Sequence, residues 1–413
     1  MKTHLNTEKA FATLLEIISP TPLMHNINIS TEHHCNVFLK REDLQPVRSY
    51  KIRGAYNKIT SLSKSERAKG VVCASAGNHA QGVAYSCFLL KIKGVVYMPT
   101  TTPTQKVEQV SMFGKEYVEI RLEGDTFDDS KNAAQTYCTS KNLSFIHPFD
   151  DIKVIEGQST VALEILKQSK EPIDYIFLPV GGGGLAAGVS DYFKKHSPKT
   201  QIIAAEPLGA PSLTAALENG GPQKLSKIDK FVDGAAVQEI GKVTFNFCQK
   251  GIDDIVLVDE GKICSTILKL YNKDAIVVEP AGALSLAALD AYHDKIKGKN
   301  VVCIVSGSNN DITRMEEIKE RSMLFEGLKH YFLVDFPQRS GALKEFVNEI
   351  LGPSDDITHF EYIKRNNKEK GPIRIGVEVR MKEDFSALKT RMESKHYQYQ
   401  YLNNNPETIQ LFF

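Results

Sequence analysis

The sequence predicts an α/β fold built on a mostly parallel sheet, followed by a small α+β domain. From Asn36 to about Ser322, short apolar runs of strand character alternate with stretches whose apolar residues recur every three or four positions. This is the pattern of a buried parallel sheet covered by helices on both faces. After Arg321, apolar and polar residues alternate strictly, which indicates a sheet with one solvated face. We therefore expect two domains, residues 1–322 and 325–413, with the boundary near 322 to 326.

The elements of the first domain follow from these patterns in order. The expected strands are 37–40, 70–75, 94–99, 117–122, 175–180, 201–206, 255–259 and 300–306, and the expected helices are 103–113, 126–141, 155–168, 261–272 and 281–293. The segment 1–20 is expected to hold an amphipathic helix and not a signal peptide, because Glu16 interrupts its apolar stretch. Sheets of this kind bind ligands beyond the carboxyl ends of their strands, so the junctions after the strands are the places to search.

The second domain has its own order of elements. A strand at 331–336 is followed by a helix from Gly341, a strand at about 357–364, the alternating strand 373–379, a helix around Leu388 and a strand at 397–402. The order βαββαβ is that of a small split-βαβ domain.

Composition excludes several classes of protein. The 413 residues carry 51 Lys+Arg against 50 Asp+Glu, without long basic runs, so binding to nucleic acid is not expected. Apolar runs of about 20 residues do not occur, which excludes a membrane span. The seven cysteines are widely spaced and mostly lie in apolar segments, which predicts buried, reduced thiols in a cytoplasmic protein.

Two polar junctions follow strands in the first half of the chain. In Ser49 to Ala55, a lysine, Lys51, lies beside Tyr50 at the start of a helix, where a cation opposes the helix dipole. Such violations of a local rule are expected at functional sites, although an isolated surface lysine is the simpler alternative. The small and polar residues Ser75-Ala76-Gly77-Asn78-His79 follow the next strand and suit an anion at a helix N-terminus. A plain helix cap by Ser75 or Asn78 is the alternative there.

Two further junctions lie in the second half of the first domain. Gly181, Gly182, Gly183 and Gly184 precede Leu185 and a helix. Four glycines cost backbone entropy and supply no packing, so we favour a nest for phosphate over a flexible hinge, while the dinucleotide spacing GxGxxG is not matched. Ser306 ends a buried strand and is able to face a ring nitrogen, although many strands end in Ser-Gly turns.

Together, a lysine, a carboxylate-sized loop, a phosphate cup and a strand-end serine are the parts of a pyridoxal phosphate site. The segments SYKIRGA, SAGNHAQG, GGGGL and SGSN resemble those of the fold-type-II pyridoxal phosphate enzymes, specifically the biosynthetic threonine dehydratases, over nearly the whole chain. The resemblance implies a tryptophan synthase β-like fold with two open parallel-sheet lobes. The segment from Phe336 to Leu343 resembles the ferredoxin-like ACT-type regulatory domain, in the single copy of the short form of these enzymes.

The resemblance also assigns roles. Lys51 is expected to hold pyridoxal 5'-phosphate as a Schiff base and to remove the substrate α-proton, with Tyr50, where the family often has Phe, beside the ring. Asn78 is expected to bond the ring hydroxyl, and Ser75, Ala76, Gly77, Asn78 and His79 to bind the substrate carboxylate. Gly181, Gly182, Gly183, Gly184 and the Leu185 N–H are expected to bind the phosphate, and Ser306 the pyridine nitrogen. Glu279 resembles a carboxylate near the ring in relatives.

The implied reaction converts L-threonine to 2-oxobutanoate and ammonia, the entry to isoleucine synthesis. A neutral serine at the pyridine nitrogen does not stabilise its protonated form, which favours loss of a β-hydroxyl over transamination. The alternatives are a catabolic serine/threonine dehydratase or a serine racemase, while the GGGGL loop argues against a cysteine synthase. A regulator with a silent catalytic domain is disfavoured because Lys51 and its partner motifs are intact.

Metal sites are not expected. The segment Glu206 to Ser212 has a serine where some racemases carry an aspartate ligand, so a divalent ion is disfavoured and a monovalent cation stays open. We expect His33-His34-Cys35 to be solvated loop residues. The resemblance further implies isoleucine (inhibiting) or valine (activating) as effectors in the C-terminal domain, with an oligomerisation module as the alternative, and a homo-oligomer, either dimer or tetramer.

Overall fold

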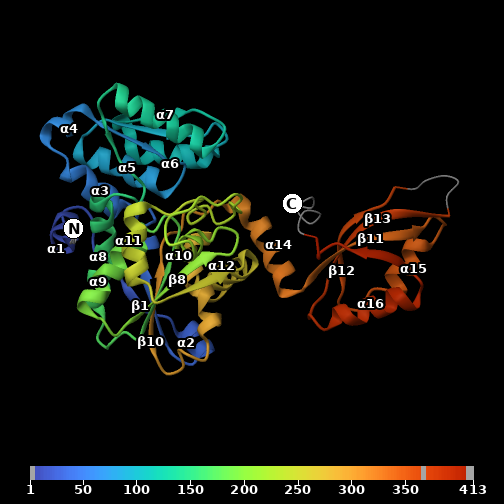
Figure 1. The fold of residues 1–413 in the computed structure, drawn as a ribbon. Helices are drawn as coiled ribbons and strands as arrows, with labels where there is room; N and C mark the ends of the chain where they lie inside the picture. The colour runs from blue at the N-terminus through green and yellow to red at the C-terminus, as the bar shows by residue number, and fades with distance from the viewer. Residues whose placement is uncertain (1–4, 364–368, 406–413) are drawn as a thin grey trace. The chain divides into compact units, whose positions relative to one another are not determined.

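The computed structural model describes residues 5–363 and 369–405 (Figure 1). The chain divides into two compact units, residues 1–311 and 312–413. This division falls earlier in the chain than the boundary expected near 322 to 326. The difference arises because helix α14 (Met315–Glu326), at whose C-terminal end the expected boundary lies, belongs to the second unit. In the described part of the chain, no helix is both long and apolar enough to cross a membrane.

The first unit contains a large lobe built on a six-stranded sheet. Its strand order is β1-β2-β10-β7-β8-β9. The bounds are β1 Leu23–His25, β2 Asn36–Arg41, β7 Tyr175–Pro179, β8 Gln201–Pro207, β9 Asp254–Val258 and β10 Asn300–Val305. All neighbours run parallel except the short edge strand β1, which the sequence analysis did not identify and which pairs antiparallel with β2. The predicted parallel sheet is therefore confirmed.

A small lobe carries a second, fully parallel sheet in the order β5-β4-β3-β6. Its strands are β3 Val71–Ala74, β4 Gly94–Met98, β5 Val118–Leu122 and β6 Ser144–Phe145, and its helices are α4 Lys64–Lys69, α5 Asn78–Leu90, α6 Thr104–Gly114 and α7 Phe127–Ser140. Alternate residues of β3 serve opposite faces: Val71 and Cys73 join the core under α5, whereas Val72 and Ala74 join the core under α7. Both faces are thus covered, which explains why β3 is apolar throughout.

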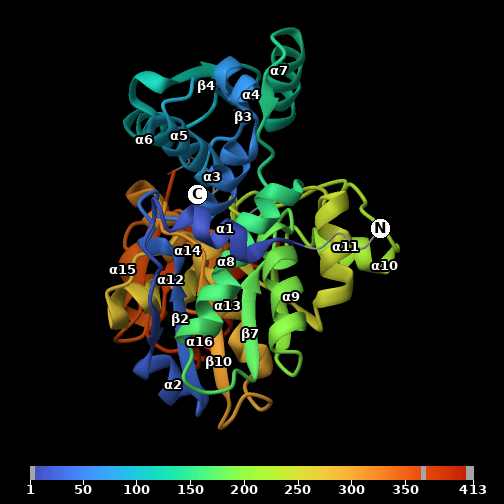
Figure 2. The same cartoon turned by 90° about the vertical axis from the view of Figure 1, so that its left-hand side faces the viewer.

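The chain enters the small lobe through α3 (Lys51–Ser61) and returns to the large lobe at α8 (Ile152–Gln168). Figures 1 and 2 show α3 between the two lobes, with the blue and teal helices of the small lobe on one side of it. The two helices touch closely, because a Cβ atom added at Gly157 of α8 would lie 2.4 Å from the carbonyl oxygen of Arg53 in α3. This crossing is the structural joint between the lobes.

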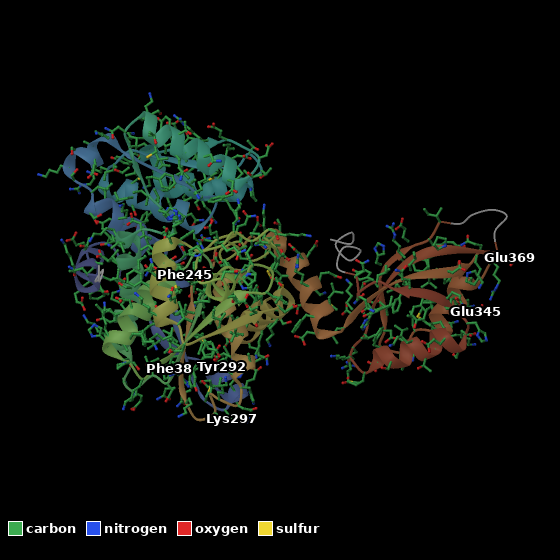
Figure 3. All side chains as sticks on the ribbon, viewed as in Figure 1. Phe38, Phe245, Tyr292, Lys297, Glu345 and Glu369 are labelled. Atoms are coloured by element: carbon green, nitrogen blue, oxygen red, sulfur yellow. The ribbon has the colours of Figure 1, made fainter. Side chains whose placement is uncertain are left out.

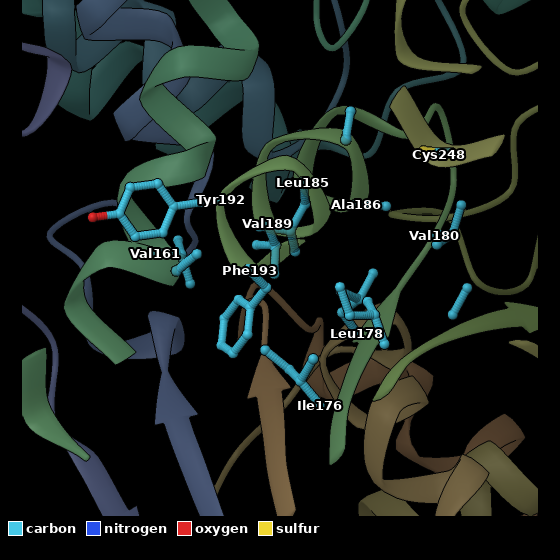
Figure 4. Packing of buried hydrophobic residues seen from close by; sticks show 14 of the residues in the cluster. Val161, Ile176, Leu178, Val180, Leu185, Ala186, Val189, Tyr192, Phe193 and Cys248 are labelled. Carbon is cyan, nitrogen blue, oxygen red and sulfur yellow. The ribbon is translucent and has the colours of Figure 1, made fainter. Parts of the chain in front are cut away.

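The core of the large lobe lies between its sheet and the helices on either side. These helices are α1 Thr7–Leu14, α2 Ile27–His33, α9 Gly184–His196, α10 Ser212–Glu218, α11 Lys242–Gly251, α12 Glu260–Asp274 and α13 Pro280–Ala287. Figure 4 shows Ile176 and Leu178 of β7 beside Val189 and Phe193 of α9, all within one buried cluster. Away from the small lobe, Tyr292 (Figure 3) packs edge-on against the Phe177 ring, with centroids 5.3 Å apart. The amphipathic N-terminal helix expected within residues 1–20 is α1.

The second unit is a four-stranded antiparallel sheet in the order β12-β13-β11-β14. Its elements after α14 are β11 Lys329–Pro337, α15 Ala342–Glu349, β12 Asp356–Glu361, β13 Lys370–Glu378, α16 Asp384–Ser394 and β14 Gln398–Tyr401. Ile373, Ile375 and Val377 face the core formed with α15 and α16, as the alternation predicts. The split-βαβ order is confirmed, and the expected strand end at Lys364 lies outside the described residues.

Candidate functional site

Three groups of predicted site residues lie beyond the carboxyl ends of adjacent strands of the large lobe, and the loop from Ser75 to His79 lies in the small lobe. Because β10 lies between β2 and β7, the residues that follow these strands share one edge of the sheet. Ser49 forms an isolated bridge with Gly307, and the Tyr50 N–H donates to the Ser306 carbonyl at 3.2 Å. Lys51, Ser306 and the glycine run after β7 are thereby brought together.

Lys51 is the first residue of α3 and lies partly exposed at this edge. Its Nζ donates to the Pro148 carbonyl at 2.9 Å and lies 5.4 Å from the centroid of the Tyr50 ring. Desolvation by the surrounding protein lowers the pKa of Lys51 to about 8, against the opposing charge of Glu279. A larger share of this amine is therefore neutral near pH 8 than for an ordinary lysine, and only the neutral amine can accept a proton or attack a carbon.

The backbone N–H groups of Gly181 through Leu185 form a cluster of hydrogen-bond donors, which we call the glycine cradle. Among the residues that the structure describes, none accepts a hydrogen bond from the N–H groups of Gly181 through Leu185. Gly182 through Leu185 are buried, so these donors require a ligand or water. Gly183, with φ of +84°, is the N-cap of α9 without a side-chain cap. A cluster of buried donors at a helix N-terminus is the arrangement that binds a phosphate.

Packing explains why this run consists of glycines. A Cβ atom at Gly182 would lie 2.2 Å from the Phe149 ring, and one at Gly181 would lie 2.8 Å from the Ala235 backbone. The outer side of the loop is therefore filled, while its N–H groups have no partner among the residues that the structure describes.

The loop Ser75 to Asn78 is partly exposed and leads into α5 in the small lobe. The N-cap is Gly77, which has no side-chain cap, and Ser75 Oγ instead accepts the Gly77 N–H at 3.2 Å. The alternative of a plain cap by Ser75 or Asn78 is thus not observed. The His79 ring lies apart from this loop, because its Nε2 pairs with the Ile146 carbonyl at 2.8 Å. Burial lowers the pKa of His79 to about 3, so the ring is neutral at pH 7.

Asn78 joins the small lobe to two residues of the large lobe. Its Nδ2 donates to Glu279 Oε1 at 2.6 Å, and its Oδ1 accepts from Asn309 Nδ2 at 2.7 Å. Burial raises the pKa of Glu279 to about 7, with repulsion from Asp233 adding to the effect and the Asn78 hydrogen bond opposing it. The predicted ring-hydroxyl partner is therefore held in place by a buried carboxyl that titrates near neutrality.

These residues fit pyridoxal phosphate. The amine of Lys51 matches its aldehyde and the glycine cradle matches its phosphate. The buried hydroxyl of Ser306, which donates to the Ala281 carbonyl at 3.2 Å, offers a neutral partner for a ring nitrogen. Two buried oxygens at the same edge, Ser49 Oγ and Asn309 Oδ1, have no partner among the described residues, so both can accept a hydrogen bond from a polar ligand or water.

Sequence reasoning missed the residues that support the cradle from a distance. The carboxylate of Asp150 accepts the N–H groups of Lys242, Val243 and Thr244 at the start of α11, with the shortest distance 2.8 Å. Thr244 Oγ1 in turn donates to the Gly182 carbonyl at 2.7 Å. The partners lie more than sixty positions apart, so no local pattern could have revealed this support.

Glu206, the residue considered for a cation, is buried and caps α10. Its carboxylate accepts the N–H groups of Leu213 and Thr214 at 2.7 and 2.9 Å and the Thr214 hydroxyl at 2.7 Å. These contacts give the carboxylate a structural role as the cap of the helix. Burial raises the pKa of Glu206.

The expectation that His33-His34-Cys35 are solvated loop residues is wrong for two of the three. His33 ends α2 and is buried, as is Cys35, while His34 is exposed. The imidazole of His33 lies 3.4 Å from His293 and near Glu32 and Asp290, a grouping that could hold a metal ion. However, Lys269 already pairs with Glu32 and Lys262 with Asp290, so the cluster has no excess negative charge to attract a cation. The seven cysteines are all free and buried, as predicted.

Comparison with known proteins also points to pyridoxal phosphate, and its matches cover nearly the whole chain. Residues 14–307 match the family described as pyridoxal-phosphate dependent enzyme, and residues 320–412 match the C-terminal regulatory domain of threonine dehydratase. The L-threonine dehydratase biosynthetic IlvA of Halalkalibacterium halodurans is 56% identical over 97% of this chain and 96% of that protein. The protein of the same name from Bacillus subtilis is 54% identical over 98% and 96%.

Solved structures resemble about three quarters of the chain. The processed form of threonine deaminase isoform 2 from Solanum lycopersicum has 40% identity and a TM-score of 0.73, and covers 76% of this chain and 93% of that one. Maize serine racemase has 30% identity and a TM-score of 0.72 over 78% and 98%.

Proposed function

This chain belongs to the pyridoxal-phosphate-dependent enzymes, and among them to the biosynthetic threonine dehydratases, and from this membership we propose how its own residues carry out the reaction. The enzyme is a lyase that converts L-threonine to 2-oxobutanoate and ammonia, the first step from threonine towards isoleucine. The observation that carries our assignment of residues is the convergence of Lys51, Ser306 and the glycine cradle at three adjacent strand ends.

We assign most of the cofactor contacts to the large lobe and one, that of Asn78, to the small lobe. The N–H groups of Gly181, Gly182, Gly183, Gly184 and Leu185 bind the phosphate, and Ser306 meets the pyridine nitrogen. Lys51 would hold the cofactor covalently, with Tyr50 beside the ring and Asn78 at its hydroxyl. When bound, pyridoxal phosphate supplies an electron-accepting ring that stabilises negative charge on the substrate Cα.

Substrate handling falls to the small lobe and to Lys51. The uncapped N–H groups at the start of α5, together with Ser75, bind the threonine carboxylate, because a helix N-terminus favours an anion. Lys51 Nζ, once released, takes the proton from Cα. Its lowered pKa keeps enough of the amine neutral to act as a base.

A comparison of L-threonine, L-serine and D-serine as substrates tests this function. A dehydratase releases 2-oxobutanoate from L-threonine, with less product from L-serine and none from D-serine. A serine racemase, the alternative suggested by the maize protein, would interconvert the serine enantiomers faster than it consumes threonine.

The C-terminal unit fits allosteric control, and we propose that it binds isoleucine or valine in a cavity beside α15. The cavity measures about 550 Å³ and offers the apolar side chains of Leu343, Val347 and Tyr362. Arg339, which also pairs with Glu345, and the residues before α15 line the cavity and suit a carboxylate. An aliphatic amino acid combines these two chemistries.

Isothermal titration of the full chain with L-isoleucine tests the effector site. We expect Val347→Asp to abolish the binding heat, because it places a charge in the apolar part of the cavity, while threonine turnover without effector stays within about twofold. Met381→Asp, at an exposed apolar position of the same unit outside the cavity, should leave binding unchanged. Equal binding by all three proteins would contradict the proposed site.

We further propose a cytoplasmic homo-oligomer, a dimer or a tetramer. The free, buried thiols support a reducing compartment. Light scattering on the purified full chain would give the mass, and a monomeric mass would contradict the assembly.

A further inference from the structure

Arg53 is a fully buried residue two positions after Lys51 on α3, and its guanidinium uses all five N–H donors. Nε donates to Glu42 at 2.8 Å, Nη1 donates to Thr160 at 3.0 Å and to Glu164 at 2.7 Å, and Nη2 donates to Glu42 at 2.7 Å and to Glu164 at 2.9 Å. A buried guanidinium with two carboxylates and no unused donor is fixed in position by charge-assisted hydrogen bonds.

The two carboxylates are themselves held by the large lobe. Lys40 of β2, also fully buried, donates to Glu164 at 2.6 Å and to the Thr21 carbonyl at 2.7 Å. The cluster of Lys40, Glu42, Arg53 and Glu164 thus contains two positive and two negative charges and is neutral as a whole. Because Glu42 lies on the turn after β2 and Glu164 lies on α8, the contacts of Arg53 with these two carboxylates tie α3 to the large lobe.

The start of α3 has no local stabilisation of its own. Its N-cap, Tyr50, makes no side-chain cap, and Lys51 places a cation in the first turn. Gly54 weakens the same turn, although it permits close contact with α8, where an added Cβ atom would lie 2.3 Å from Gln158. The position of this turn must therefore be set by tertiary contacts.

Helix geometry places Arg53 on the opposite side of α3 from Lys51. Residues two apart on a helix point about 200° apart, so an anchor at Arg53 directs Lys51 towards the sheet edge and Pro148. Figures 1 and 2 show α3 at the junction of the lobes, where a small rotation would move the amine.

We propose that Arg53 is a positioning residue for Lys51, acting through its five-donor contact with Glu42 and Glu164 on the large lobe. This inference rests on the proposed role of Lys51. It predicts that loss of the contact lowers turnover more than it weakens substrate binding, because a displacement of about 1 Å at a reacting group can cost about a hundredfold in rate.

The test compares Arg53→Lys with the matched control Lys40→Met in the full-length holoenzyme. The lysine keeps the charge but offers at most three donors without the planar fork. The control removes a charge from the same buried cluster but keeps all three partners of Arg53, so both variants should lower the temperature of unfolding. We expect Arg53→Lys to lower kcat at least about tenfold with KM for threonine changed less than about threefold. Lys40→Met should keep kcat within about threefold.

A second measurement does not depend on activity. In cofactor-free protein, the pH profile of reductive methylation at Lys51, followed by peptide mass spectrometry, reports the surroundings of this amine. Arg53→Lys should shift the profile to higher pH, because a displaced amine meets more water, whereas Lys40→Met should leave it in place.

Two results would overturn the inference. One is an Arg53→Lys enzyme with kcat within twofold of wild type and an unchanged methylation profile. The other is an equal fall in kcat and an equal shift in both variants, which would make the cluster a general source of stability. If Arg53→Lys fails to fold, Thr160→Val, which removes one acceptor, is judged by the same criteria, with an expected loss of about threefold in kcat. Full turnover by Lys51→Ala would instead refute the proposed role of Lys51, independently of any Arg53 result.

Discussion

The raised pKa of Glu279 predicts how the free energy of unfolding changes with pH, and by how much. Its carboxyl is buried, accepts the Asn78 amide at 2.6 Å and has a pKa raised from 4.5 to about 7 by burial. In the unfolded chain the same group ionises near 4.5. Between these two pH values the folded protein keeps a proton that the unfolded chain has released, so the free energy of unfolding falls as pH rises.

Between pH 4.5 and about 7, each pH unit lowers the free energy of unfolding by about 1.4 kcal/mol. Ionisation of this one group therefore lowers the free energy of unfolding of the cofactor-free protein by about 3 kcal/mol by pH 8. Glu279→Gln removes the ionisation and keeps an oxygen that accepts from Asn78. We therefore expect the variant to match wild type within about 1 kcal/mol at pH 4.5, and to exceed its stability by about 3 kcal/mol at pH 8.

Urea unfolding of the cofactor-free full chain at pH 4.5, 6, 7 and 8 measures this difference, at one protein concentration because assembly also stabilises. The C-terminal unit is the same in both proteins and cancels in the comparison. Glu218→Gln, at an exposed position of α10, is the control and should differ from wild type by less than about 0.5 kcal/mol throughout. A difference between Glu279→Gln and wild type that does not change with pH, or that shrinks as pH rises, would refute the reasoning.

Two further substitutions test the glycine cradle and its support. In Gly182→Ala the new Cβ atom would lie 2.2 Å from the Phe149 ring, so the loop must shift and cofactor affinity should fall at least about tenfold with about 1 to 3 kcal/mol of lost stability. Titration of cofactor-free protein with pyridoxal phosphate measures this, and an unchanged dissociation constant would contradict the packing argument. Asp150→Ala removes the cap of α11 and should cost about 1 to 2 kcal/mol of unfolding free energy. A loss below about 0.3 kcal/mol in urea unfolding would show that the cap is not needed.

The fold and the position of the candidate site beside the ends of strands were predictable because their signals are local. Ser306 directly follows the apolar run of a buried strand, Lys51 stands at a helix start shortly after another such strand, and the glycine run also stands next to a helix start. The alternation from Ile373 to Val379 likewise predicts one buried face, and those residues form the core of the second unit.

The remaining parts depend on contacts between distant segments. Arg53 reaches Glu164 across 111 positions, and Asp150 caps a helix that starts 92 positions later. A charged residue in an apolar strand, such as Lys40, gives no sign that it is fully buried until its partners are known. The same reason explains the error at His33, because this residue packs against His293, which lies 260 positions away in the sequence.

The most direct test of the account is the formation of 2-oxobutanoate from L-threonine by the full-length protein with added pyridoxal phosphate. We predict steady turnover by wild type, similar turnover by Lys58→Ala on the same helix, and a fall of at least about a thousandfold in Lys51→Ala. Full turnover by Lys51→Ala, or no 2-oxobutanoate from the wild-type holoenzyme, would contradict the central claim that Lys51 at the start of α3 carries the chemistry.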